Sequence, residues 1–128
     1  MIFLLDTHAL LWALLQPHLL PAVVRSLIQD PMNFPHVSSA TVWEIVTKHR
    51  LGKLPLAADI APRIDQHLAR LGTTALPINH AHARVAASFT SSNKDPFDRI
   101  LAAQAIVEGI PIATRDRFFT DVGAPTIW

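Results

Sequence analysis

Four acidic residues, Asp6, Glu44, Asp98 and Asp116, lie in separate segments of the chain, and each stands beside an apolar run that suits a buried strand or helix. Carboxylate oxygens are ligands that Mg²⁺ and Mn²⁺ prefer in proteins. A cation held by such a group can activate water and stabilise the charge that develops during attack on a phosphodiester. If the fold gathers these acids, we therefore expect a magnesium- or manganese-dependent nuclease.

Several of these acids also have an ordinary structural interpretation. Asp6 can cap a helix, which is worth about 1 kcal/mol, and Asp116 can serve as a turn residue. Asp95 is a good N-cap for a helix that begins with proline, and Asp98 near the start of that helix suits a capping box. We assign Asp95 mainly to capping, with a supporting place beside the metal site.

Glu44 is more informative because apolar residues flank it on both sides, in Val42-Trp43-Glu44-Ile45-Val46. Charged side chains are rarely buried unless they are paired or bound to a metal. A pair with Lys48 on the next helical turn would be sufficient for an exposed Glu. That pair explains less well an acid near the start of a helix that follows a strand, and this position favours a place in the site.

Most of the eleven Lys and Arg residues stand close in sequence to one of the four acids. Acids interleaved with bases suit a site that holds a cation and binds a polyanion around it, although ordinary surface ion pairing gives the same pattern. We expect Lys48, Arg50, Lys94 and Arg99 to contact the phosphates of an RNA substrate. The net charge of +1 favours no partner by itself.

Other kinds of site find little support in the composition. The chain has no cysteine, which excludes a disulfide scaffold and a thiolate zinc site, and its seven histidines show no zinc-binding spacing. Its four glycines form no phosphate-binding loop. We interpret Trp12 and Trp43 as packing residues rather than base-stacking ones, and His8 as solvated or packed. The apolar runs are too short for a membrane span and no signal peptide is evident, so we expect a cytoplasmic protein.

The elements that must position the acids alternate between short apolar strands and helices. Strands are predicted over 2–5, 34–37, 73–76, 110–113 and 125–128, and helices over 7–15, 21–30, 40–50, 59–70, 80–89 and 97–107. This alternation predicts a three-layer α/β/α sandwich with a central parallel sheet of about four or five strands, in one domain spanning 1–128. Ligands of such sheets bind outside the carboxyl ends of the strands, where Asp6 and Asp116 fall.

These segments resemble a known family. The resemblance is carried by Leu4-Leu5-Asp6-Thr7-His8-Ala9-Leu10-Leu11-Trp12, Ser39-Ala40-Thr41-Val42-Trp43-Glu44-Ile45, Asp95-Pro96-Phe97-Asp98-Arg99 and Thr114-Arg115-Asp116. In order and spacing they are similar to the PIN-domain ribonucleases, and most similar to the VapC-like toxins of bacterial toxin–antitoxin pairs.

The resemblance implies a PIN-like fold, Mg²⁺ or Mn²⁺ dependence, endoribonuclease activity and neutralisation by a cognate antitoxin protein. By position it makes Asp6, Glu44, Asp98 and Asp116 the acidic quartet, with Thr7 and Thr114 as small polar residues that support it. The apolar early helices, between Ala9 and Ile28, would supply a surface for the antitoxin or for a homodimer.

Three alternatives stay open at this point. A phosphatase with a strand-end aspartate nucleophile would usually carry a second acid two residues later, where this chain has His8. A phosphoacceptor receiver domain needs paired acids after the first strand and a lysine after a late one, whereas Asp6 stands alone and Arg115 precedes the last acid. A non-catalytic α/β interaction module would keep the fold only, and the intact quartet argues against it.

Overall fold

A five-stranded parallel sheet lies at the centre of the computed structural model, which describes all 128 residues. The strand order is β3-β2-β1-β4-β5, and every neighbouring pair is parallel. The strands are β1 (Ile2–Leu5), β2 (Phe34–Ser38), β3 (Thr74–Leu76), β4 (Ile112–Ala113) and β5 (Thr126–Ile127). The sheet confirms the predicted fold class.

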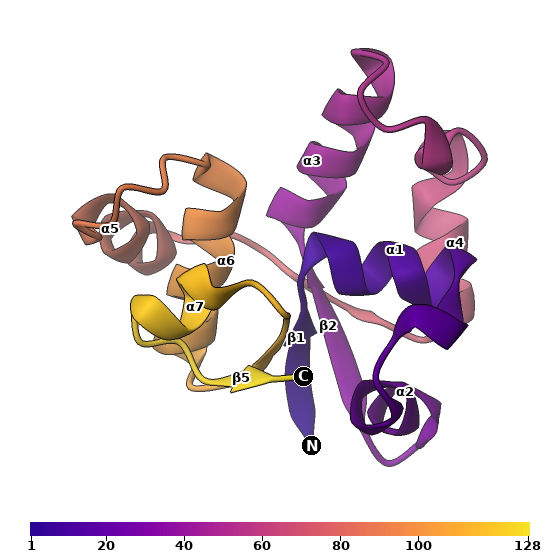
Figure 1. The fold of residues 1–128 in the computed structure, drawn as a ribbon, viewed down its shortest axis with the longest axis horizontal. Coiled ribbons are helices and arrows are strands. Elements are labelled where there is room, and N and C mark those ends of the chain that lie inside the picture. The colour runs from indigo at the N-terminus through magenta and orange to yellow at the C-terminus, as the bar shows by residue number, and fades with distance from the viewer.

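Helices cover both faces of this sheet (Figure 1). They are α1 (Thr7–Leu15), α2 (Ala22–Gln29), α3 (Ser39–Arg50), α4 (Ile64–Leu71), α5 (His80–Ser88), α6 (Pro96–Glu108) and α7 (Arg117–Asp121), with short 3₁₀ turns at Pro17–Leu19, Pro55–Ala57 and Ala61–Arg63. None of the helices is both long and apolar enough to span a bilayer.

Alternation along β1 divides the core into two halves. Phe3 and Leu5 point into a cluster formed with α1 to α4, whereas Leu4 points into a second cluster formed with α6 and α7. All three side chains are fully buried. Because β1 is buried on both faces, its residues are apolar without interruption, and this continuous apolar run is the pattern that predicted the strand.

The structure corrects the predicted elements at three places. Two of them are at prolines, and the third is a helix that was not predicted. Pro111 has no amide to donate to a strand ladder, and regular pairing in β4 begins only at Ile112. The helix predicted over 59–70 is a 3₁₀ turn containing Pro62 followed by α4, because proline cannot donate the α-helical hydrogen bond. The short helix α7 was not predicted, and Asp116 caps it rather than a simple turn.

The strand order determines where the site can form. From β1 the chain runs outward to β2 and β3, then returns to the other side of β1 as β4 and β5. In open parallel sheets this reversal opens a crevice at the carboxyl ends of the strands. Asp6 follows β1 at that edge, Ser38 at the end of β2 caps α3, and Thr114 follows β4.

Candidate active site

A cleft of about 530 Å³ opens where β1 and β4 end. Its lining residues are Asp6, Thr7, His8, Leu11, Glu44, Lys48, Leu54, Asp98, Arg115, Asp116 and Arg117. The structure thus brings all four sequence-predicted acids to one cleft, although they come from four separate segments. Thr7 also lies in the lining, whereas Asp95 and Thr114 stand beside it.

Asp6 is buried at the floor of this cleft and also caps α1. Its Oδ1 accepts a hydrogen bond from the backbone N–H of Ala9 at 2.6 Å, so the capping interpretation is right. Burial raises the pKa of the Asp6 carboxyl, and hydrogen bonds from Thr114 and Ala9 oppose that shift without cancelling it. Asp6 therefore combines a structural role with a place among the cleft acids.

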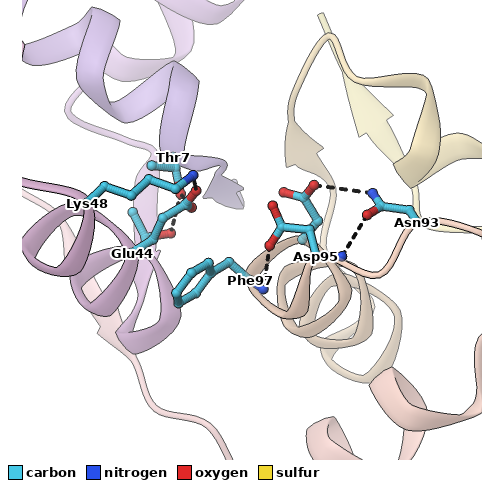
Figure 2. A network of polar contacts seen from close by, with 8 residues as sticks. Thr7, Glu44, Lys48, Asn93, Asp95 and Phe97 are labelled. Carbon is cyan, nitrogen blue, oxygen red and sulfur yellow. Dashed lines mark hydrogen bonds and ion pairs between the residues drawn. The ribbon is translucent and has the colours of Figure 1, made fainter. Parts of the chain in front are cut away.

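Glu44 is buried, with 6 % of its surface exposed, and both of its carboxylate oxygens have partners. Oε1 accepts a hydrogen bond from the Thr7 hydroxyl at 2.6 Å, and Oε2 forms an ion pair with Lys48 on the next turn of α3. Figure 2 shows this group on one side of the cleft, with Asn93 and Asp95 on the other. The Lys48 pair and the position in the cleft, which the sequence left as alternatives, are present together.

Lys48 places a positive charge among these acids. Partial burial lowers the pKa of its ammonium group, but the hydrogen bond and charge of Glu44 outweigh this and raise the pKa overall. The negative charges of Asp95 and Asp98 act in the same direction. Lys48 thus compensates part of the negative charge of the cleft.

Asp98 lies in the first turn of α6, where Asn93 orients it. The Asn93 Nδ2 donates to Asp98 Oδ2 at 3.3 Å, while the Asn93 Oδ1 accepts from the backbone N–H of Asp95 at 2.9 Å. Burial first, and then the negative charge of Asp95, raise the pKa of Asp98 to about 6. Glu44 and Asp116 add to this upward shift, which shows that the acids of the cleft interact.

Asp116 is the exposed acid of the four. Its Oδ1 accepts from the backbone N–H of Phe118 at 2.9 Å and so caps α7. Its own backbone N–H donates to the hydroxyl of Thr114 at 3.0 Å. Thr114 is buried and also hydrogen-bonds to Asp6, so it links the two acids that follow β1 and β4.

The donor set of the cleft fits a hard divalent cation in its chemistry. Every acid supplies carboxylate oxygen, and the raised pKa values of Asp6 and Asp98 reflect carboxylates that are desolvated and crowded by like charge. As the side chains stand, no three acidic or histidine groups converge on one point. Backbone amides, Lys48 and Asn93 hold the acids individually instead.

The basic residues of the cleft differ from those that the sequence suggested. Of the predicted phosphate contacts, Lys48 lines the cleft, whereas Arg50 and Lys94 are exposed outside its lining. Arg115 and Arg117, which flank Asp116, do line it. Their position directly beside a strand-end acid is the signal in the sequence that could have identified them.

Arg99 makes contacts that the sequence did not predict. Its guanidinium donates to the carbonyl oxygens of Ala86 at 3.1 Å, Phe89 at 2.5 Å and Asn93 at 2.9 Å, and it lies 5.7 Å from the centroid of the Phe89 ring. These contacts hold the guanidinium against α5 and the loop that precedes α6. We therefore assign Arg99 to holding these segments, and its contact with RNA stays a prediction.

The aromatic residues near the cleft also depart from the sequence interpretation. Trp43 is 58 % exposed rather than buried in the core, and its ring packs edge-to-face against Phe97 at 4.8 Å. This contact joins α3 to α6 beside Glu44 and Asp98. Trp12 is half-buried against the core, as predicted, but it also contacts His8 and Arg115 at the cleft.

Comparison with known protein families gives a match to the PIN domain over residues 3–125. This chain belongs to the PIN-domain family. Nucleases of this family generally use a divalent metal. Ribonuclease VapC16 of Mycobacterium tuberculosis is 40 % identical to the PIN-domain chain over 58 residues, which are 45 % of this chain and 41 % of that protein. The match therefore spans less than half of the relative's length.

Solved structures confirm the PIN-like fold. The crystal structure of VapBC2 from Rickettsia felis, bound to a promoter DNA fragment, aligns over 100 % of this PIN domain and 99 % of that chain, with a TM-score of 0.72 and 16 % identity. The structure of VapBC-1 from nontypeable Haemophilus influenzae aligns over 99 % of this chain and 97 % of that chain, with a TM-score of 0.70 and 15 % identity. The structure of FitAcB from Neisseria gonorrhoeae aligns over 98 % of this chain and 96 % of that chain, with a TM-score of 0.66 and 24 % identity.

Proposed function

We propose that residues 1–128 form one nuclease domain, a metal-dependent endoribonuclease that acts in the cytoplasm as the toxin of a toxin–antitoxin pair. The observation that supports this most strongly is a basic-rimmed cleft lined by four carboxylates, of which two have raised pKa values. Membership of the PIN-domain family and the ribonuclease activity in the name of a relative support the same proposal.

Asp6, Glu44, Asp98 and Asp116 are the residues that would hold Mg²⁺ or Mn²⁺ in this cleft. When bound, such an ion activates a water molecule for attack on the phosphodiester and stabilises the charge that develops. Thr7 orients Glu44 through its hydroxyl, and Thr114 fixes the segment that carries Asp116. Asp95 supports the site by starting α6 in the right place for Asp98.

The basic residues of the cleft would hold RNA by its phosphates. Lys48, Arg115 and Arg117 line the cleft, and the exposed Arg50 and Lys94 extend positive charge beyond it. Phosphate contacts position a strand without selecting its sequence. Loss of one such contact lowers the dependence of binding on salt by a slope of about 0.7 for a single-stranded target.

The surface of α1 and α2 offers a place for a partner protein. Leu15, Leu19 and Val23 are exposed there, with 37 %, 43 % and 49 % of their surface accessible. Apolar side chains grouped on a surface often mark protein interfaces. The related VapBC and FitAB structures are toxin–antitoxin complexes. We propose that this surface serves a cognate antitoxin or a second copy of this chain.

A purified Asp6→Asn variant tests the catalytic proposal. Asn caps a helix nearly as well as Asp, so the variant keeps the fold. RNA cleavage should be lost, because the variant lacks one carboxylate of the cleft. Cleavage is followed on single-stranded RNA with Mg²⁺, with Mn²⁺ and with a chelator. Asp59→Asn, at an exposed acid outside the cleft, is the matched control and should cleave like the wild type.

The same experiment separates the competing functions. Wild-type activity in Asp6→Asn would contradict the catalytic assignment. Hydrolysis of a phosphate monoester without cleavage of RNA would indicate the phosphatase alternative. An intact fold with neither activity would indicate an interaction module.

In cells, expression of the wild-type chain alone should arrest growth, whereas expression of the Asp98→Asn variant should not. Equal arrest by both would show that the harm does not come from the carboxylate site.

A further inference from the structure

We infer that a nucleobase-stacking subsite, formed by Trp12, Arg115 and His8 with Trp128 behind it, adjoins the cleft. This inference rests on the proposed function, since only a nucleic-acid substrate would bring a base into the cleft. It adds a site for the base of a nucleotide to the phosphate contacts described above. The ligand class is a planar nucleobase of single-stranded RNA.

The cluster joins three parts of the chain around one indole ring. The guanidinium carbon of Arg115 lies 4.8 Å from the centroid of the Trp12 ring. The His8 ring meets the same indole edge-on, with centroids 4.6 Å apart and an interplanar angle of 90°. Trp128 lies 5.8 Å away, tilted by 41°. Trp12 is thus surrounded by a flat cation and two further rings.

The cluster adjoins the cleft acids. His8 and Arg115 both line the cleft that holds the carboxylates. His8 stands two residues after Asp6, and Arg115 is the direct neighbour of Asp116. A nucleotide whose phosphate lies in the cleft beside these acids therefore has its base close to the cluster.

The exposure of the cluster argues against a purely structural role. His8 and Arg115 are exposed, and Trp128 is 39 % exposed. Arg115 has no carboxylate partner, because the salt bridges of the chain involve Lys48, His82 and Arg117 instead. An arginine that has no carboxylate partner and is exposed beside an indole has a guanidinium that a ligand can reach.

The chemistry of that face fits a base. A phosphate binds the N–H edge of a guanidinium, whereas a nucleobase stacks on the plane of an arginine or on an aromatic ring. Stacking of one base contributes about 1–3 kcal/mol and tolerates any sequence, because every base has a π face. A base stacked on Arg115 would lie next to the contact that Arg115 already makes with the Trp12 ring.

The test compares a short single-stranded RNA with versions that lack the base at one position at a time. All proteins carry Asp98→Asn to prevent cleavage, and binding is measured by fluorescence anisotropy over a range of salt concentrations. We expect one abasic position to weaken binding by about tenfold or more, the effect of losing one stacked base. Positions elsewhere should change binding much less.

Arg115→Lys keeps the positive charge but removes the planar guanidinium group. It should therefore keep the salt dependence of binding and lose most of the abasic effect at that position. Arg117→Lys is the matched control on the other side of Asp116 and should keep the abasic effect. Trp12→Leu should act like Arg115→Lys, and because Trp12 also packs against the core, circular dichroism must show that this variant is folded.

The outcomes separate the inference from the proposed function. Salt-dependent binding that is equal for intact and abasic RNA would overturn the stacking subsite and leave the nuclease proposal standing. An abasic effect that persists in both Arg115→Lys and Trp12→Leu would also overturn it, and the cluster would then serve another ligand, such as a protein partner. Absence of any RNA binding in the parent protein would overturn both.

Discussion

Asp6 and Asp116 each give one oxygen to the start of a helix while they line the cleft. Replacement by alanine would therefore remove a cap and a cleft acid together, and a loss of activity would have two explanations. Replacement by asparagine separates these effects, because the amide oxygen still accepts the hydrogen bond of the cap. The choice of substitution thus decides what a mutational experiment on these residues measures.

The raised pKa of Asp98 predicts how stability depends on pH. The pKa is about 6 in the folded chain against an ordinary value of 3.8. Between these values the folded state binds more protons than the unfolded state, so the free energy of unfolding decreases as pH rises through this range. Asp98→Asn should reduce this dependence, to which Asp6 also contributes, and should stabilise the metal-free protein by about 1 kcal/mol at neutral pH, discounted because Asp98 is only partly buried.

Urea denaturation in the presence of a chelator, at a pH below the pKa of Asp98 and at neutral pH, measures this effect. Asp59→Asn is again the control and should not change the pH dependence. A variant Asp98→Asn that is less stable than the wild type at neutral pH would contradict the proposed crowding of the acids.

The sequence allowed the cleft acids, the Lys48 partner of Glu44 and the capping by Asp6 to be predicted, but not the contacts of the arginines. The acids follow apolar strands or lie among apolar residues, and this placement is visible locally for Asp6 and Glu44. Whether Arg99 contacts RNA or backbone carbonyls depends on a loop whose path no local pattern specifies. The contact of Arg115 with Trp12 joins opposite ends of the chain and was likewise not predictable.

At the scale of elements, the two sides of the cleft are α3 and the first turn of α6. Trp43 and Phe97 connect these helices, and each stands next to a cleft acid. The loop before α6 is held by Arg99 through backbone carbonyls. The position of Asp98 therefore depends on contacts made outside the cleft.

Arg99→Ala should loosen this loop and the position of Asp98. Loss of several hydrogen bonds to partly buried carbonyls should lower the free energy of unfolding by about 2 kcal/mol. Affinity for Mn²⁺, measured by electron paramagnetic resonance, should also fall, because Asn93 would no longer orient Asp98. Arg99→Lys should recover part of both effects, and Arg50→Ala, at an exposed arginine of α3, should change neither. Unchanged Mn²⁺ affinity in Arg99→Ala would show that Asp98 does not need this loop.

The alternation of elements could be predicted from sequence because short segments rich in apolar residues alternate with helix signals. The strand order could not, since alternation alone does not say where the chain reverses across β1. The helix α7 was missed because five residues carry too little periodicity to be recognised.

At the scale of the whole molecule, the central position of β1 explains why distant acids meet. β2 leads into the helix that carries Glu44 on one side of β1, and β4 leads to Asp116 on the other. The cleft therefore forms only when β2 and β4 have both paired with β1. Local segments of this chain would not assemble the site separately.

The helix caps around the cleft should also respond when a cation binds in the cleft. The backbone amides of Ala9, Phe97 and Phe118 each donate to a carboxylate oxygen of Asp6, Asp95 or Asp116. A cation that draws Asp6 or Asp116 towards itself weakens the bond to the corresponding amide. In ¹⁵N spectra, addition of Mg²⁺ should therefore shift the Ala9 and Phe118 signals and increase their hydrogen exchange. The amide of Ala40, which Ser38 caps on α3, should change little. Equal shifts at all helix starts would instead indicate a general effect of ionic strength, and the amides of Ala9 and Phe118 would lose their value as local sensors.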